Sequence, residues 1–179
     1  IIVIGSSNVD MVVRTSHLPA PGETILGGEF FMNQGGKGAN QAVAIKRLGG
    51  NLIFMAKLGN DVLGRQSVGY FKKEGIDTRA VLEDTEYFTT MAFVELDERG
   101  ERSFSFARKP GADTMLRKEE LDEKLLSNCK IFHFGSLSLT NEPSRSATLE
   151  AISIAKKAGV IISYDPNYRA SLWKSECTA

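Results

Sequence analysis

Short continuous apolar runs alternate with longer segments of helical periodicity along most of the chain. Continuous apolar runs are typical of strands buried on both faces of a parallel sheet, and apolar residues three or four positions apart mark the buried face of a helix. The predicted strands are Ile1–Ile4, Leu52–Lys57, Ile131–Phe134 and Val160–Tyr164, and the predicted helices are Gly38–Leu48, Asp61–Glu74 and Pro143–Ala158. This order predicts an α/β fold, a parallel sheet with helices on both faces.

Two regions have a different pattern, with short alternating strands joined by turns. The first pairs Met11–Arg14 with Thr24–Phe31, and the second pairs Thr89–Glu95 with Arg102–Ala107 across a loop at Glu98–Gly100. Alternation with turn residues between the runs predicts β-hairpins. These strands form either an extra edge sheet of the main domain or a separate small sheet, and their interruption of the α/β pattern at two places favours the separate sheet.

The start of the first predicted helix carries a glycine-rich loop, Gly35-Gly36-Lys37-Gly38-Ala39-Asn40. Glycine lets the backbone approach a ligand closely, and a helix N-terminus offers free N–H groups. A dinucleotide fingerprint requires a third glycine, which is missing here, and a P-loop requires Ser or Thr after Lys37, where Gly38 stands. On the glycines alone, a structural turn and a ligand loop remain equally open.

Composition narrows the function classes. The chain has 179 residues, of which 42% are hydrophobic, so a single domain over residues 1–179 can bury a real core. Its 22 basic and 22 acidic residues give a net charge of zero, which provides no electrostatic footprint for nucleic acid or a membrane surface. The two cysteines, Cys129 and Cys177, lack metal-binding spacing, and no signal peptide or membrane-spanning run is visible, so we expect a cytoplasmic protein.

Several spaced motifs together resemble the ribokinase (PfkB-type) family of carbohydrate kinases over essentially the whole chain. Besides the glycine loop they are Asn8-x-Asp10, Leu58–Gly64 and Asp165-Pro166-Asn167-Tyr168-Arg169. Up to about residue 80 the likeness is to ribokinases, and from about residue 85 it is to fructokinases and 2-keto-3-deoxygluconate kinases, notably at Phe132–Leu137. The resemblance implies a ribokinase-like fold in three layers, ATP and Mg²⁺ as cofactors with a monovalent cation possible, and further strands and helices after residue 179.

The resemblance also implies a role for the two hairpin regions. In the family such strands form a small β-sheet lid over the sugar, at about residues 11–31 and 85–107 of this chain. In the family the lid often packs against a second subunit. We therefore expect a homodimer that forms through apolar lid residues, which would be exposed on the isolated subunit. Those named for this role are Val12, Ile25, Phe93 and Phe104.

The sugar-binding residues expected from the family lie at strand ends and at the helix start. Asn8 and Asp10 follow the first strand two positions apart, so their side chains share a face, and ligands of open α/β sheets bind beyond the carboxyl ends of the strands. Taken alone, the pair also fits an Asx turn. By the resemblance, Gly35, Gly36 and Asn40 form the opposite wall of one cleft.

Arg108 and Arg169 match arginines that approach the sugar or phosphoryl region in the keto-sugar kinases, and a surface position is the alternative for both. The guanidinium fork suits a carboxylate or a phosphate. By the same resemblance, Asp165 and Asn167 are assigned to the phosphate and Mg²⁺ side. No metal ligands are assigned, and His17, His133 and the helix faces at Lys72–Glu74 and Lys118–Glu120 receive no role.

Two departures from the family pattern bear on function. Ser136 stands near the position of a sugar-binding glutamate of ribokinases, which favours fructose or a related keto-sugar over ribose. The Gly-Ala-Gly-Asp turn that supplies the catalytic base is absent, and Gly111-Ala112-Asp113 follows a lid hairpin and lacks the second glycine, so we assign no catalytic residue. The expected function is the sugar-binding part of an ATP-dependent kinase, inactive alone, and the alternative is a non-catalytic sugar-binding or interaction module.

Overall fold

The computed structural model describes residues 1–17, 19–96 and 102–173, which form two sheets and their helices. A five-stranded sheet has the order β5-β4-β1-β8-β9, and a four-stranded sheet has the order β3-β2-β6-β7. The strands are β1 Ile2–Ile4, β2 Asn8–Arg14, β3 Phe30–Gly35, β4 Ile53–Gly59, β5 Asp77–Asp84, β6 Met91–Leu96, β7 Arg102–Ala107, β8 Ile131–Gly135 and β9 Ile161–Asp165. The α-helices are α1 Lys37–Arg47, α2 Val62–Lys73, α3 Glu123–Ser127 and α4 Ser144–Lys157.

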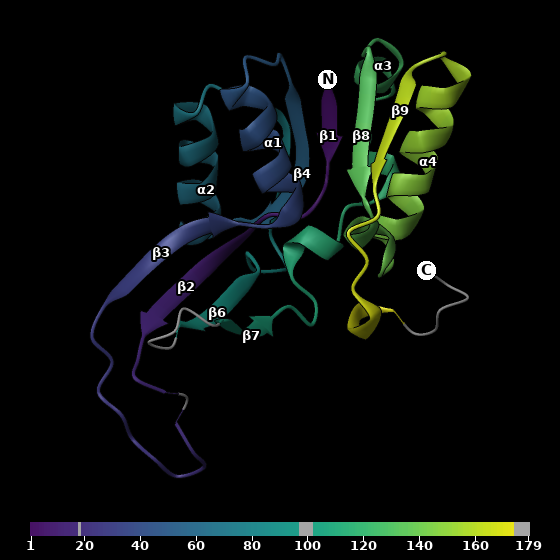
Figure 1. Cartoon of the computed structure of the whole chain (residues 1–179). Helices are drawn as coiled ribbons and strands as arrows, with labels where there is room; N and C mark the ends of the chain where they lie inside the picture. Colours follow the sequence, from purple (N-terminus) through teal and green to yellow (C-terminus); the bar gives the residue numbers. More distant parts are fainter. Residues whose placement is uncertain (18, 97–101, 174–179) are drawn as a thin grey trace.

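The five-stranded sheet is the core of the molecule, and all its pairs are parallel. Helices α1 and α2 cover one face, and α3 and α4 cover the other (Figure 1). Val3 and Phe54 pack under α1 and α2, whereas Ile4 and Phe132 pack against the alanines of α4. Alternate residues of the central strands therefore enter two separate hydrophobic layers, which explains the continuous apolar runs in the sequence. The predicted α/β fold with helices on both faces is confirmed.

Helix ends follow the local signals in the sequence. Asp61 accepts a hydrogen bond from the Gly64 N–H at 2.7 Å and caps α2. Gly49, Gly75 and Gly159 follow α1, α2 and α4 with positive φ values, as a C′ glycine does. Ala158 was expected to face inward, but it is exposed because it lies beyond the last helical turn.

The strand expected at Val160–Tyr164 was predicted to be buried, and this was wrong. The observed strand, β9, lies at the edge of the sheet, and Ile161 is 64% exposed because no further strand of the described residues pairs beside it. The strand β5 was not predicted. It begins two residues after Gly75, the glycine that ends α2, its apolar residues Ala80–Leu82 are flanked by charged and polar ones, and it forms the opposite edge of the sheet.

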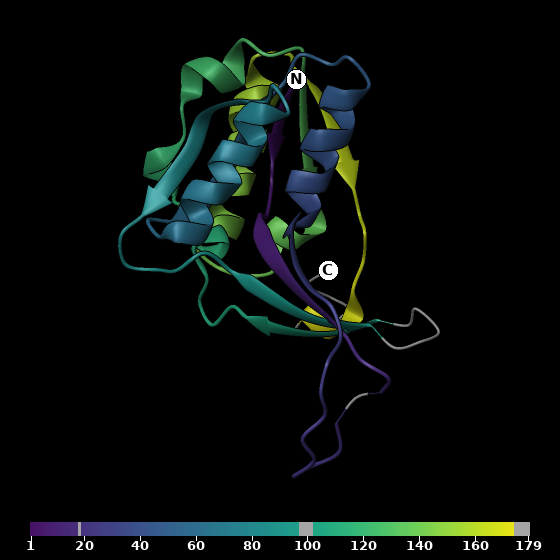
Figure 2. The ribbon, with the colours of Figure 1, turned by 90° about the vertical axis from the view of Figure 1, so that its left-hand side faces the viewer.

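The four-stranded sheet, here called the lid sheet, lies beyond the carboxyl ends of the core strands (Figures 1 and 2). Its strand β7 matches the predicted Arg102–Ala107, and β2 and β6 overlap their predictions. The predicted strand Thr24–Phe31 is wrong over most of its length. The observed strand β3 pairs Gly35 with Asn8 and Phe30 with Val13, so it ends in the glycine loop. The loop predicted at Glu98–Gly100 lies outside the described residues.

The lid sheet has two faces that follow from its register, because side chains alternate along each strand. We call them the Asp10 face and the Phe93 face. The Asp10 face carries Asn8, Asp10, Val12, Asn33, Gly35, Ala92, Val94, Phe104 and Phe106. The Phe93 face carries Val9, Met11, Val13, Phe30, Met32, Met91, Phe93, Ser103 and Ser105.

Exposed aromatic residues lie on both faces of the lid sheet. Phe93 is 48% exposed and Phe104 is 52% exposed, as the sequence led us to expect. Val12, also expected to be exposed, is buried in a small cluster with Ala92 and Val94, because neighbouring strands cover it on both sides. Ile25 is half-buried. The apolar side chains of the lid are therefore only partly covered within the described chain.

A buried charge network ties the core to the segments that enter and leave the lid. The Lys57 side chain in β4 is 3% exposed and lies 2.9 Å from Asp84 at the end of β5 and 2.6 Å from Glu120. Asp84 also accepts hydrogen bonds from the N–H groups of Glu86 and Tyr87. The prediction of a solvated helix face at Lys118–Glu120 was wrong for Glu120, because this short 3₁₀ turn brings its carboxylate to Lys57.

Within the described part of the chain, no helix is both long enough and apolar enough to cross a membrane.

Candidate functional site

The glycine loop meets the first lid strand at the junction of the two sheets. Gly35, at the end of β3, is paired with Asn8, at the start of β2. A Cβ atom at Gly35 would collide with the side chains of both Asp10 and Asn8, lying 2.7 Å from Asn8 Nδ2. The Asn8 amide donates a hydrogen bond of 2.6 Å to Asp10 Oδ1. Three of the predicted site residues are therefore in direct contact, and a side chain at position 35 would displace the ends of the Asp10 and Asn8 side chains.

The pKa of Asp10 is shifted by its surroundings. Burial raises the pKa of Asp10 above its ordinary value, while the hydrogen bond from Asn8 and the charge of Arg102 act in the opposite direction. A carboxyl group with this environment gains from additional hydrogen-bond donors, because they stabilise its charged form. The hydroxyl groups of a sugar are such donors.

The second glycine of the loop sets the start of α1. Gly36 has a φ of 96°, in the region that favours glycine, and a Cβ there would lie 2.6 Å from the Ser6 carbonyl oxygen. Ala39 donates its N–H to the Ser6 carbonyl at 3.1 Å, which fixes the first turn of the helix against the end of β1. Asn40 lies on that first turn with its side chain exposed. Its convergence with Asp10 on one cleft stays a prediction.

Arg108 lies where β7 leaves the lid and is held by an ion pair within the chain. Its guanidinium group contacts the Asp113 carboxylate at 2.8 Å, and the same carboxylate accepts a hydrogen bond of 2.6 Å from Thr90. Asp113 is buried in this arrangement, so it is engaged in structure and cannot reach an attacking hydroxyl group. Arg108 is thus fixed at the base of the lid, and its contact with a substrate stays a prediction.

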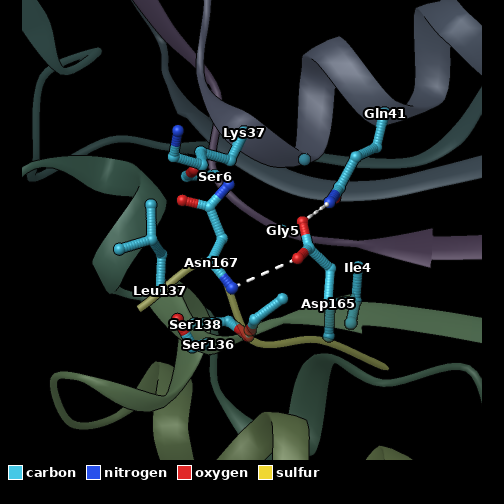
Figure 3. A pocket seen from close by; sticks show the side chains of 12 residues that line it. Ile4, Gly5, Ser6, Lys37, Gln41, Ser136, Leu137, Ser138, Asp165 and Asn167 are labelled. Carbon is cyan, nitrogen blue, oxygen red and sulfur yellow. Dashed lines mark hydrogen bonds between the residues drawn. The ribbon is translucent and has the colours of Figure 1, made fainter. Parts of the chain in front are cut away.

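A small pocket of about 10 Å³ lies where the carboxyl ends of β1, β8 and β9 meet the start of α1 (Figure 3). Polar residues from four separate stretches of the chain line it, among them Ser6, Lys37, Gln41, Ser136, Asp165 and Asn167. The volume is close to that of one water molecule. The pocket joins Asp165 and Asn167, assigned to the phosphate side, with the glycine loop. Arg169, exposed four residues after Asp165, is not among its lining residues.

Two side-chain oxygens in this pocket are buried and have no hydrogen-bond partner among the described residues, Ser136 Oγ and Gln41 Oε1. Buried polar atoms without partners are uncommon and call for an explanation, such as a bound ligand or water. Lys37, at the first position of α1, adds a cation beside the helix N-terminus. Free N–H groups, a cation and a hydroxyl group fit an anionic phosphate group.

Sequence reasoning assigned no role to Gln41 and Lys37, although both belong to the glycine-loop motif. Their position could have been found from helical geometry, because residues 37 and 41 are one turn apart and share a helix face. Phe104 and Phe106 were also missed as neighbours of the site. Their rings stack 6.2 Å apart on the Asp10 face, and Phe106 is in register with Ala92 and, through it, with Asp10.

The two histidines lie apart from the glycine loop. Burial lowers the pKa of His133, and Asp165 opposes this effect, while its ring contacts Ser163 at 2.9 Å. His17 pairs with Glu23 on the exposed segment between β2 and β3. In the described ranges, no group of three or more His, Cys, Asp or Glu side chains is placed to hold a metal ion.

Comparison with known proteins identifies this arrangement. The model of the pfkB family carbohydrate kinases matches residues 1–179, and the chain belongs to this family. It is 43% identical to the probable fructokinase-5 of Arabidopsis thaliana over 98% of the chain and 53% of that protein. It is 42% identical to the fructokinase of Solanum tuberosum over 100% of the chain and 55% of that protein.

The fold is shared with solved structures of the same kind. The crystal structure of fructokinase with bound ATP from Xylella fastidiosa superposes with a TM-score of 0.83 at 35% identity, covering 98% of this chain and 54% of that one. The chain thus spans about half the length of the relatives it matches. The predicted ribokinase-like fold and the family are confirmed.

Proposed function

We propose that this chain is the sugar-binding part of an ATP-dependent carbohydrate kinase whose substrate is fructose or a related keto-sugar. The observation that carries the proposal is the contact of Asn8, Asp10 and Gly35 at the junction of lid and core, where a side chain at position 35 would displace the Asn8 and Asp10 side chains. The proposal draws further support from the fructokinases that the chain resembles.

The sugar would lie against the Asp10 face of the lid sheet. Asp10 accepts hydrogen bonds from sugar hydroxyl groups, and Asn8 both orients Asp10 and offers its own amide oxygen. Gly36 and Asn40 form the opposite wall, and Arg108 borders the base of the lid. Buried polar groups left without a partner discriminate strongly against a ligand that lacks the matching hydroxyl group.

The nucleotide would approach from the side of the small pocket. Lys37 and the N–H groups at the start of α1 face the transferred phosphate, and Asp165, Asn167 and Arg169 border the same region. Bound Mg²⁺ would neutralise charge on the phosphate groups. The residues present fit the phosphate better than the metal ion, because both Asp165 oxygens already accept hydrogen bonds within the chain.

The preference for a keto-sugar rests on Ser136. Its hydroxyl group is buried beside the phosphate-side pocket and has no partner in the described structure. A serine hydroxyl has one neutral oxygen, so it cannot replace a carboxylate, whose two charged oxygens can each accept a hydrogen bond from a different hydroxyl group of ribose. We therefore expect fructose to be phosphorylated ahead of ribose.

The catalytic base would come from a part of the protein outside this chain. Asp113 is the nearest match to the family's base in sequence, and its carboxylate is buried in the contacts to Arg108 and Thr90. General-base catalysis contributes about 10²–10⁴-fold, and phosphate positioning contributes more. The isolated 179-residue chain is therefore expected to be inactive.

The test is ADP release with a panel of sugars, measured on the full-length protein that contains this sequence and on the isolated chain. We expect turnover of fructose above ribose by the full-length protein and none by the isolated chain. Turnover by the isolated chain contradicts the missing-base argument. Sugar binding without turnover by the full-length protein supports instead a non-catalytic sugar-binding module.

We also propose a cytoplasmic homodimer that forms through the lid sheet. The Phe93 face borders a groove of about 520 Å³ whose other wall includes Pro19, Ile25 and Gly27. Phe30 and Phe93 stay exposed on this face, and a monomer rarely exposes contiguous apolar surface of this kind. A second lid sheet would fill the groove and cover both rings.

A further inference from the structure

A single side chain links helix α1 to the end of β9. Gln41 lies one turn into α1, and its Nε2 donates a hydrogen bond of 2.8 Å to Asp165 Oδ2 across 124 residues of sequence (Figure 3). The other oxygen, Asp165 Oδ1, accepts the N–H of Asn167 at 3.1 Å. The Asp165 carboxylate thus holds the turn after β9 from one side and is itself held by Gln41 from the other.

The turn that Gln41 secures has an uncommon backbone. Asn167 has a φ of 30°, on the positive side that residues other than glycine adopt at a cost. Such conformations persist where surrounding contacts enforce them, and they occur often at functional sites. The hydrogen bond from the Asn167 N–H to Asp165 is one such contact, and it depends on the orientation of the carboxylate.

The orientation of the Gln41 amide is fixed by its partner. A carboxylate accepts hydrogen bonds and does not donate them, so Nε2 must face Asp165. The amide oxygen, Oε1, therefore points elsewhere, and it is buried without a partner among the described residues. It is an acceptor in a lined pocket, available to an N–H or O–H group that enters it.

We propose that Gln41 is a positioning residue for phosphoryl transfer, which sets the Asp165–Asn167 turn at a fixed distance from the glycine loop. The inference rests on the proposed kinase function. Helix α1 begins directly after Gly36, so the Gln41–Asp165 bond joins the sugar-binding loop to the phosphate-side turn as one unit. Its loss leaves the sugar contacts at Asp10 in place and displaces Asn167 from the pocket.

The direction of this hydrogen bond can be reversed without a change of shape. Gln41→Glu places a carboxylate against Asp165, which removes the donor and introduces repulsion. Asp165→Asn combined with Gln41→Glu restores a bond, because the new amide at position 165 donates to the new carboxylate and its oxygen still accepts the Asn167 N–H. The four proteins, wild type, both single variants and the combination, form a double-mutant cycle.

In the full-length protein, we expect Gln41→Glu to lower kcat/KM for ATP about tenfold or more, the loss typical of one charge-assisted hydrogen bond. The sugar KM should stay within about twofold, and the combined variant should recover most of the loss. The matched control is Gln66→Glu, at an exposed position of α2 away from the pocket, and it should leave both parameters unchanged.

Hydrogen exchange gives a readout that does not depend on catalysis. The peptide that contains the Asn167 N–H should exchange faster in Gln41→Glu than in the wild type and return toward the wild-type rate in the combined variant. If the wild type proves to have no kinase activity, the proposed function fails while exchange still tests the bond.

Two results overturn the inference. One is a kcat/KM for ATP that is unchanged in the Gln41→Glu variant of an active enzyme. The other is a combined variant no better than Asp165→Asn alone, which would mean that Asp165 acts directly on the ligand.

Discussion

The core sheet and the lid sheet cover their apolar residues differently. In the core, Val3, Phe54 and Phe132 are fully buried between two layers of helices. In the lid, Val12 and Val94 are buried, whereas Phe93 and Phe106 remain about half exposed. The chain's own helices cover the core, whereas part of the apolar surface of the lid is exposed. We propose that the sugar covers the Asp10 face and that a second subunit covers the Phe93 face.

The largest effect should come from the core side of the comparison. Lys57→Met leaves Asp84 buried without its cation, so the free energy of unfolding should fall by about 3–5 kcal/mol, the range for breaking a buried ion pair. The matched control is Lys72→Met on the exposed side of α2, which should change stability by less than about 0.5 kcal/mol. Urea unfolding measures both. Equal losses in the two variants would show that the buried charge network does not stabilise the fold more than an exposed lysine does.

The same network predicts a pH dependence. Burial opposes the charge of Asp84, but Lys57 and the N–H groups of Tyr87 and Glu86 hold the pKa of Asp84 below its ordinary value. Its contribution is present above the unfolded pKa of about 4 and is lost as pH falls through the lower folded value. Burial also opposes the charge of Lys57, but Glu120 and Asp84 raise its pKa, so its contribution is lost only as pH rises through that raised value.

The difference in unfolding free energy between wild type and Lys57→Met should therefore be constant near pH 7 and shrink in strong acid. Urea unfolding at pH 7 and at about pH 3 measures the change. A difference that is the same at both pH values would contradict the role of Asp84.

One glycine at the junction of core and lid and one inside α2 allow a paired test. Gly36→Ala forces an L-residue to a φ of 96° and against the Ser6 carbonyl, and should cost about 1–3 kcal/mol. Gly69→Ala, inside α2 with open space around it, should stabilise the protein by about 0.5–1 kcal/mol. Thermal unfolding of both variants decides the outcome, and two changes of the same sign would contradict the account of the loop.

The smallest effect on folding should come from the lid. Phe93→Ser should change the free energy of unfolding of the monomer by less than about 0.5 kcal/mol and weaken self-association about tenfold, as loss of a buried interface aromatic does. Leu48→Ser, which removes an exposed apolar residue at the end of α1, is the control and should not affect association. Light scattering over a concentration series measures both. A wild-type protein that stays monomeric at high concentration would rule out the lid dimer.

The elements that the sequence predicted correctly are those with local signals. Asp61 and the glycines after α1, α2 and α4 mark helix ends through contacts within a few residues. The position of β9 was predicted correctly, but its burial was not. Whether a strand is buried depends on the strands beside it, and β9 lies at the edge of the sheet. The strand before the glycine loop was misplaced for a similar reason, since its register is set by pairing with β2.

The candidate site likewise contains residues that sequence motifs predicted and contacts that only the structure shows. Asn8, Asp10 and Gly35 belong to two motifs that carry the family resemblance, and they meet in the structure. The Gln41–Asp165 bond and the Lys57 network join residues far apart in the chain, and no local pattern indicates such pairs. Arg108 was recognised as a candidate, but its pairing with Asp113 became visible only when β7 was placed beside β6.

The central claim is that sugar is bound at the junction through Asp10, while the nucleotide is bound from the pocket side. The most direct test is the pair of KM values of Asp10→Asn in the full-length protein, with fructose and ATP varied in turn. Because the charged hydrogen bonds to the sugar are lost, we predict a loss of about 2–3 kcal/mol in kcat/KM for fructose, with the KM for ATP nearly unchanged. An unchanged kcat/KM for fructose, or an equal loss for both substrates, would contradict it.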